Sequence, residues 1–188
     1  MEIKTVKKDI IIIDIETTDF FNKGGLIVEI GIALVNLDAG IIQPLYNKIV
    51  KEKGFGEEHK DSWIFKNSDL KFEDVMNAEP INKIEIQKIL NEYWATAYNK
   101  KFDFTFLEDR GFKIKALPCP MLVATPICKI KNDYGYKYPS VEEAYKILVG
   151  DGYIEKHRGL DDAMHEAEIV LSLYKSKNFV TELRKKKK

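Results

Sequence analysis

Cysteine and histidine are scarce in this sequence. Among its 188 residues there are two cysteines and three histidines. Cys119 and Cys128 have no second cysteine pair with which to complete the usual tetrahedral zinc site. We therefore interpret both as structural thiols of a reducing compartment, and we expect a cytoplasmic protein.

A long apolar run is also missing. The first nine residues include five charged ones, and the apolar stretch that follows them, residues 10–13, ends at Asp14. This segment is too short and too interrupted for a signal peptide or a membrane span. We therefore expect no membrane association.

The chain lacks an excess of charge of either sign. Lys plus Arg and Asp plus Glu number 30 each, and five of the positive charges lie in residues 184–188. The rest of the chain therefore carries 25 positive charges against 30 negative ones. Such a body does not attract a polyanion by overall charge, so any affinity for nucleic acid must come from local basic clusters or bound cations.

Length and hydrophobic content indicate one domain. With 45% hydrophobic residues, the chain has enough apolar material for a single well-buried core. We expect this domain to span residues 1–183. Residues 184–188 form a basic C-terminal tail, which is typical of a solvated end that adds at most non-specific attraction for phosphates.

The first half of the chain predicts a β-meander. Residues 10–13 are an unbroken β-branched run, as in a strand buried on both faces. Residues 26–37 and 41–50 are two further β-rich runs, joined by a short turn at residues 38–40. Residues 51–79 have no regular pattern, and we expect loops and short helices there.

The second half predicts alternating helices and strands. Apolar residues at helical spacing and a capping box at Ser140 and Glu143 support the helices. We expect helices over residues 81–94, 102–111 and 140–148 and from Asp161 or Asp162 to Tyr174, with strands over residues 95–98 and 121–125. The result is an α/β fold with a five-stranded sheet.

Asp14 and Glu16 follow the first predicted strand. Because side chains on a strand alternate with period two, both carboxylates leave the same face. Two adjacent carboxylates repel each other, and burial makes that repulsion costly unless a cation binds between them. The pair therefore indicates a metal site, although either residue alone could equally begin a turn or cap a helix.

Asp103 lies among Phe102, Phe104 and Phe106, in the first turn of a predicted helix. It could serve there as a helix N-terminal charge. The preceding Asn99, Lys100 and Lys101 bring an amide and two ammonium groups close to this carboxylate, and such groups could hold a phosphate.

The third group is His157 in a predicted loop, followed by Asp161 and Asp162 at the start of the last helix. Histidine titrates near neutral pH and suits proton abstraction from water, whereas the plainer interpretation is a solvent-exposed side chain. Asp161 could cap the helix and leave Asp162 free for function. The sequence alone does not decide between the two acids.

Together, Asp14-Ile15-Glu16-Thr17-Thr18, residues 99–103 and residues 157–162 resemble the motifs of the DEDDh 3′ to 5′ exonucleases. This family includes the proofreading subunit of the bacterial replicative polymerase. The resemblance implies a ribonuclease H-like fold, with a mixed five-stranded sheet (an antiparallel meander, then parallel strands) flanked by helices. It extends from about Ile10 to Tyr174.

The resemblance also implies a mechanism. Four carboxylates would hold two divalent cations, Mg²⁺ or Mn²⁺, and His157 would be the general base in the release of nucleoside 5′-monophosphates. The metal ligands would be Asp14, Glu16, Asp103 and Asp162. Thr17, Asn99 and Phe102 are candidates for contacts to the terminal nucleotide, with core packing as the alternative for Thr17 and Phe102.

The implied substrates are single-stranded or frayed 3′ ends of DNA or RNA, and a polymerase partner would be a separate chain. The chain departs from the family pattern at two places. Tyr98 stands where the family often has His, and Thr18-Asp19 stands where Gly is common. Both lie where the terminal nucleotide is expected, so base or sugar preference is open.

Two other functions deserve comparison. A haloacid dehalogenase-type phosphatase also places Asp-x-Asp after a strand, and Gly150-Asp151 resembles its later acidic motif. However, the second acid here is Glu16, the predicted meander replaces parallel crossovers, and Asp103 and His157 have no role. A non-catalytic nucleic-acid-binding domain of the same fold would not need four converging carboxylates.

A set of lysines interleaved with tyrosines could form a basic and aromatic wall for single-stranded substrate. It consists of Lys100, Lys101, Lys129, Lys131 and Lys137 with Tyr134, Tyr136 and Tyr138. We prefer the plainer interpretation of a charged surface loop, because nothing in the spacing places these residues on one face.

Overall fold

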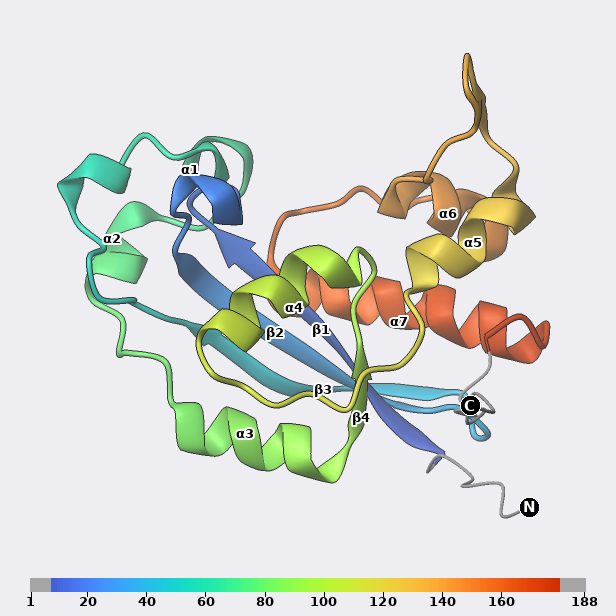
Figure 1. Ribbon diagram of the computed structural model, residues 1–188, viewed down its shortest axis with the longest axis horizontal. Helices are drawn as coiled ribbons and strands as arrows, with labels where there is room; N and C mark the ends of the chain where they lie inside the picture. Colours follow the sequence, from blue (N-terminus) through green and yellow to red (C-terminus); the bar gives the residue numbers. More distant parts are fainter. Residues whose placement is uncertain (1–7, 180–188) are drawn as a thin grey trace, which may run out of the picture.

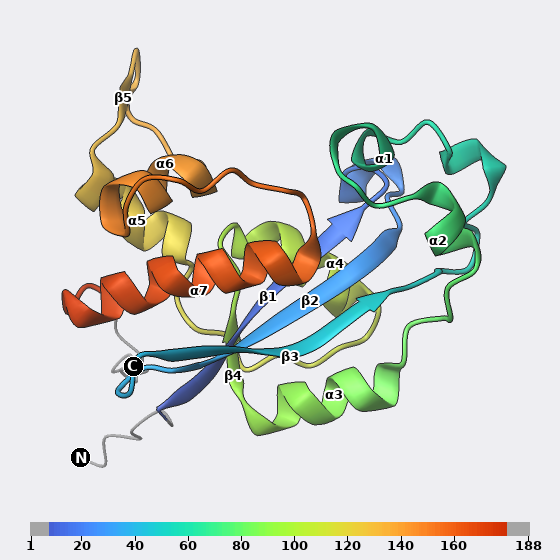
Figure 2. The same ribbon diagram turned by 180° about the vertical axis from the view of Figure 1, so that it is seen from behind.

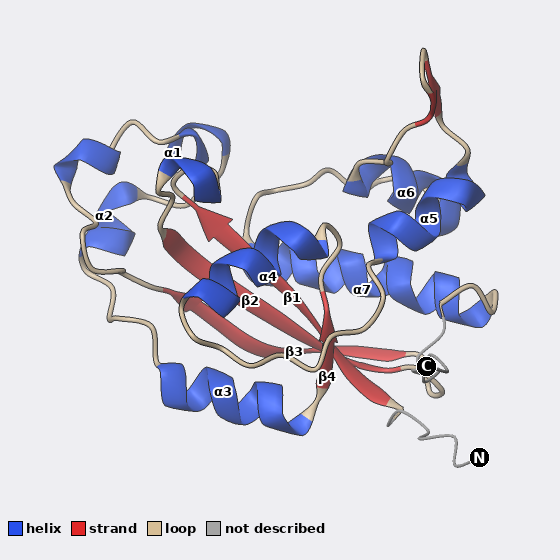
Figure 3. Cartoon of the chain, viewed as in Figure 1, coloured by secondary structure: helices blue, strands red, loops and turns tan. Residues whose placement is uncertain are grey.

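The computed structural model describes residues 8–179, so the basic tail predicted at 184–188 lies outside the described residues. Its central element is a four-stranded mixed sheet with helices on both faces (Figure 1 and Figure 3). The strands lie in the order β3-β2-β1-β4, with bounds β1 Asp9–Thr17, β2 Ile27–Asn36, β3 Ile41–Ile49 and β4 Trp94–Thr96. The α/β fold class and the β-meander are confirmed.

The helices form two layers. On one face α7 (Gly159–Lys175) lies against β1 and β2, with α5 (Pro120–Cys128) and α6 (Val141–Leu148) packed on it (Figure 2). On the other face lie α3 (Lys83–Glu92) and α4 (Lys100–Asp109). Within residues 8–179, no helix has the length and apolar character needed to cross a membrane.

β1 lies inside the sheet because its isoleucines suit burial on both faces. It pairs antiparallel with β2 and parallel with β4. Ile10 and Ile12 pack into the core below α7, whereas Ile11 and Ile13 pack into the core below α3 and α4. These apolar contacts hold the strand in place, and its carboxyl end carries Asp14 and Glu16.

Residues 51–79 contain loops and short elements, as predicted: η2 (Glu57–His59), α1 (Trp63–Asn67) and α2 (Phe72–Met76). Their apolar side chains pack with Val28 of β2 into a small core around Phe55 and Phe72. In Figure 1 this insert lies beside the carboxyl end of β1, so it forms one wall of the region where the predicted catalytic residues gather.

The predicted fifth strand over residues 121–125 is wrong, because these residues belong to α5. Pro120 at the start of the helix has no N–H to leave unsatisfied, and an apolar run of this length suits a helix as well as a strand. The position next to β4 is taken instead by a single parallel bridge between Ala95 and Ala116. The sheet of the described residues therefore has four strands and one bridge.

Candidate active site

Asp14 and Glu16 end the buried part of β1. They alternate with the buried Ile13 and Ile15, so both carboxylates leave the same face, as the strand period predicts. The pairing of β1 with β2 shifts register after Glu16, because Thr17 pairs with Ile27 and Val28 is left out of the ladder. Both acids line a cavity of about 970 Å³.

The start of α7 approaches these acids because two glycines meet. A Cβ on Gly31 of β2 would lie 2.0 Å from the carbonyl carbon of Gly159, and a Cβ on Gly159 would lie 2.8 Å from the Gly31 nitrogen. No larger side chain fits at either position without moving backbone. The helix therefore begins directly on the strands, and its first turn delivers Asp162 to the end of β1.

Asp162, and not Asp161, is the acid that faces the site. Its carboxylate accepts hydrogen bonds from the Tyr153 hydroxyl at 2.6 Å and from the backbone N–H groups of Lys156 at 3.2 Å and Arg158 at 2.9 Å. These three donors hold the buried carboxylate in one orientation. The adjacent Asp161 pairs instead with the Lys156 ammonium, at 2.8 Å.

The alternative in which Asp161 caps this helix is wrong. The helix begins at Gly159 with Arg158 as its N-cap residue, so Asp161 already lies inside the first turn. Arg158 is held by the buried Glu29 of β2, with its Nε and Nη2 donating to the two carboxylate oxygens at 2.9 and 3.0 Å. This two-point ion pair ties the residue before the helix to β2.

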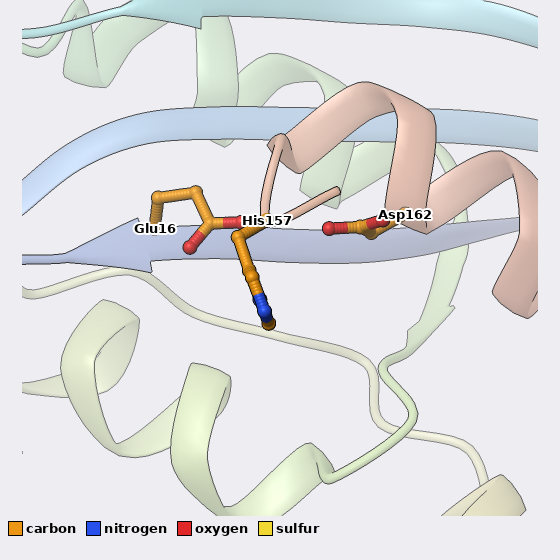
Figure 4. A group of neighbouring side chains, drawn as sticks. All are labelled: Glu16, His157 and Asp162. Carbon is orange, nitrogen blue, oxygen red and sulfur yellow. The ribbon is translucent and has the colours of Figure 1, made fainter. Parts of the chain in front are cut away.

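His157 precedes this anchor and points into the cavity. Nitrogen or oxygen atoms of Glu16, His157 and Asp162 all lie within 4.8 Å of one another (Figure 4). The backbone of His157 has φ 55°, a conformation that few non-glycine residues adopt and that persists only where the surroundings impose it. The His157 side chain is 28% exposed, so the predicted solvent-exposed alternative does not describe it.

Two neighbours restrict the imidazole. The Trp63 ring of α1 lies edge-on to it, with centroids 4.6 Å apart, and Glu155 Oε1 lies 3.9 Å from His157 Nδ1. Trp63 is otherwise exposed and comes from the insert, whose irregular sequence gave no indication of this contact.

Asp103 reaches the same cavity from the first turn of α4. Its Oδ1 accepts a hydrogen bond from the backbone N–H of Ile15, at 3.2 Å, between the two acids of β1. Burial raises the pKa of Asp103 to about 7, although this backbone donor favours the charged form. The structure therefore places Asp103 in the first turn of a helix, as the sequence predicts, and beside the end of β1 that carries Asp14 and Glu16.

Glu166 is an acidic residue of the site that the sequence analysis missed. It lies four residues after Asp162 on α7, is 3% exposed, lines the cavity and accepts a hydrogen bond from the Tyr98 N–H at 3.1 Å. The available signal was an acid inside the apolar stripe that includes Ala163 and Ala167, since such a stripe normally excludes charge.

The electrostatics of the cavity favour a cation. Burial, followed by the charge of Glu166, raises the pKa of Asp14 well above its ordinary value, and burial followed by the charge of Asp162 does the same for Glu16. Within residues 8–179, neither of these acids forms an ion pair with Lys, Arg or His, and the same holds for Asp103 and Glu166. Converging oxygen ligands without a protein cation are the donor set that Mg²⁺ or Mn²⁺ prefers.

The predicted contacts to a terminal nucleotide lie at the cavity wall. Thr17, Asn99 and Phe102 all line it. The Thr17 hydroxyl donates to the Asp19 carbonyl. Asn99 is the N-cap residue of α4, but its exposed side chain forms no capping hydrogen bond. Phe102 lies partly against Phe106, with ring centroids 5.2 Å apart, so it combines core packing with a face toward the cavity.

The lysines beside Asn99 do not hold a phosphate in this arrangement. The Lys100 ammonium donates to the Leu117 carbonyl, and neither Lys100 nor Lys101 lines the cavity. Lys23, in the segment that follows β1, lines the cavity instead.

The structure does not fit the phosphatase alternative. Asp151, which that alternative would use, is exposed and pairs with Lys146, and the antiparallel meander does not match parallel crossovers.

Comparison with family models and with curated proteins finds no match. Among solved structures, the chain is similar to a full-length 3′-exonuclease, with a TM-score of 0.69 and 14% identity. The similarity covers 97% of this chain and 65% of that chain, so this chain spans just under two thirds of its length. It is also similar to the nuclease domain of 3′hExo, a DEDDh family member solved with rAMP bound, with a TM-score of 0.69 and 17% identity. This similarity covers 98% of this chain and 100% of that domain. Cell-death related nuclease 4 gives a TM-score of 0.66 and 12% identity, with coverage of 90% of this chain and 64% of that chain. At these identities the likeness shows the fold.

Proposed function

We propose that this protein is a metal-dependent 3′ to 5′ exonuclease of the DEDDh type that releases nucleoside 5′-monophosphates from DNA or RNA. The observation that carries the proposal is the convergence of acids from three separate elements, together with His157, at the carboxyl end of β1. Asp14 and Glu16 come from β1, Asp103 from α4 and Asp162 from α7. A domain that only binds nucleic acid gains nothing from carboxylates that repel its ligand.

These four carboxylates would hold two divalent cations, Mg²⁺ or Mn²⁺. When bound, such cations supply an activated water and stabilise charge on the phosphate and on the leaving 3′ oxygen. The protein contributes a buried, preorganised set of oxygen ligands. The hydrogen bonds from Tyr153 and from two backbone N–H groups orient Asp162, and the Ile15 N–H orients Asp103.

His157 would accept the proton of the attacking water. Its nitrogens lie close to Glu16 and Asp162, and Glu155 faces Nδ1. The left-handed backbone of His157 and the Trp63 ring limit where the imidazole can move. A base in this position can reach a water held by the acids, which is the geometric requirement for general base catalysis.

The terminal nucleotide would lie between Phe102 on α4 and the segment of Thr17 after β1, near Asn99. A cavity of about 970 Å³ is large enough for one nucleotide and part of the next. The similar solved structures agree with this class of substrate: one contains rAMP, and another is described as recognising the 3′ end of a histone mRNA stem-loop. Single-stranded or frayed 3′ ends are therefore the substrates to test first.

The test is digestion of end-labelled single-stranded DNA and RNA with Mg²⁺, Mn²⁺ or EDTA. We expect a ladder that shortens from the 3′ end, with loss of activity in EDTA and in the Asp14→Ala and His157→Ala variants. Asp74→Ala is a matched control, because this exposed acid of α2 lies outside the cavity. Binding without degradation under every metal condition would contradict the proposal and favour the non-catalytic domain.

A further inference from the structure

A small hairpin projects from the layer of α5 and α6 (Figure 1 and Figure 2). It consists of β5 (Lys131–Asn132) and β6 (Gly135–Tyr136), and every residue from 131 to 136 is exposed. Gly135 has φ 123°, and the Asn132 side chain accepts a hydrogen bond from the Tyr134 N–H, so the turn is built locally. The hairpin contributes no side chain to the described cores.

The strand register places one lysine and two tyrosines on the same face of this hairpin. Lys131 is paired directly with Tyr136. One further backbone hydrogen bond, from the Lys137 N–H to the Ile130 carbonyl at 2.9 Å, continues the pairing beyond β6, and Tyr138 is the next residue after it. By the two-residue period, Tyr136 and Tyr138 share a face with Lys131. Lys137 lies on the opposite face and pairs with Glu143.

These tyrosine rings are available to a ligand. Tyr134, Tyr136 and Tyr138 are 97%, 51% and 62% exposed. Within residues 8–179, none of the three stacks on another aromatic ring, and Lys131 forms no ion pair. Large apolar rings that bury so little surface do not stabilise the fold, so their presence beside a free ammonium calls for another explanation.

The base of the hairpin is joined to the wall of the cavity. The Tyr98 hydroxyl donates to the carbonyls of Pro139 and Ser140, at 3.1 and 3.2 Å, and the next residue, Val141, lines the cavity. Figures 1 and 2 show the hairpin and α1 rising on the same side of the sheet, with the carboxyl end of β1 beside α1 and the hairpin above α5 and α6. A polymer that left the cavity past Val141 would run toward the base of the hairpin.

We propose that the Lys131, Tyr136 and Tyr138 face binds the single-stranded segment that trails from the terminal nucleotide. This inference rests on the proposed function. Exposed aromatic rings accept bases by stacking whatever the sequence, and an unpaired lysine among them attracts the phosphates. Lys129 adds a second exposed positive charge at the start of the hairpin against the single acid Asp133, so the local charge suits a polyanion although the body of the chain does not.

The test is fluorescence anisotropy with 5′-labelled oligonucleotides of three and twelve nucleotides, with Ca²⁺ in place of Mg²⁺ to slow hydrolysis. The trimer fills only the cavity, whereas the 12-mer can reach the hairpin. We expect the Tyr136→Ser/Tyr138→Ser variant to bind the 12-mer about a hundredfold more weakly, roughly tenfold for each lost base contact, and to bind the trimer as the parent does. Tyr136→Phe, which keeps the ring, should bind the 12-mer like the parent.

Controls separate the hairpin from general charge and from folding. Lys131→Ala should weaken binding of the 12-mer and reduce its salt dependence, whereas Lys88→Ala, an exposed lysine of α3, should change neither. Thermal unfolding of the serine variant should match that of the parent. If the parent binds both oligonucleotides and the serine variant loses nothing on the 12-mer, the inference is wrong and a protein partner becomes the better occupant. If the parent binds neither oligonucleotide, the proposed function itself fails.

Discussion

Replacing Asp103 by Asn should stabilise the metal-free protein while removing the stabilisation that a divalent cation gives. The pKa of Asp103 is raised by burial from 3.8 to about 7, so ionising this carboxyl in the folded state is costly above neutral pH. At about 1.4 kcal/mol per pKa unit, the cost reaches about 4 kcal/mol at pH 8. Asn keeps an acceptor for the Ile15 N–H, but its own N–H₂ group lacks a partner, which costs about 1–2 kcal/mol.

The net gain is therefore on the order of 2 kcal/mol at pH 8 in EDTA, or a rise in Tm of roughly 4–8 °C for a chain of this size. The sign depends on pH. Below about pH 4 the carboxyl is protonated in both states and contributes no penalty, and the penalty on the parent then grows as the pH rises toward the folded pKa of Asp103 of about 7. The advantage of Asn should appear over the same interval and level off above it.

Adding Mn²⁺ should reverse the order. A cation that binds only the folded parent stabilises it by about 2.7 kcal/mol at a hundredfold excess over Kd, and the Asp103→Asn variant, with one ligand fewer, should gain much less. Differential scanning calorimetry of both proteins from pH 4 to 8, with EDTA or Mn²⁺, measures this. Asp133→Asn is the control for an exposed acid. A variant that is less stable than the parent in EDTA at pH 8, or that gains as much from Mn²⁺, would refute the reasoning.

Three further substitutions probe other parts of the site. Gly159→Ala should lower the free energy of unfolding by about 1–3 kcal/mol despite the better helix propensity of Ala, because the added Cβ meets the Gly31 backbone. Activity should fall about a hundredfold. Urea unfolding and digestion rates measure the two effects. Glu166→Gln should weaken Mn²⁺ binding in calorimetric titration without abolishing it, and an unchanged affinity would remove Glu166 from the site. Trp63→Ala should lower kcat up to about tenfold with little change in KM, because the Trp63 ring packs on His157. Trp63→Phe should restore most of kcat. A change confined to KM would indicate a role in substrate binding instead.

The sequence was sufficient where one local rule determines geometry. The two-residue period of a strand placed Asp14 and Glu16 on one face, and the β-branched run before them identified a buried strand. The capping box at Ser140 marked the start of α6 and is present in the structure. These features depend on a few neighbouring residues, so no knowledge of the tertiary fold was needed.

The sequence was insufficient where distant residues decide. Whether Asp161 or Asp162 faces the site depends on where α7 begins, and that is determined by Glu29 and by the contact between Gly31 and Gly159, more than a hundred residues apart along the chain. The apolar residues 121–125 satisfy both strand and helix patterns. The contact of Trp63 with His157 joins an irregular insert to a loop, and no periodicity links the two.

Three consecutive residues at the start of α7 join the fold to the proposed chemistry. Gly159 permits the helix to touch the strands, Arg158 anchors it through the buried Glu29, and His157 precedes that anchor in a left-handed conformation. A histidine on a free loop would sample many positions and lose proton-transfer efficiency, whereas one tied to a buried ion pair by a single peptide bond has few. The same anchor brings Asp162 to the end of β1. The positions of the proposed base and of a proposed metal ligand therefore depend on one packing contact, and a change that moves the helix should impair both together.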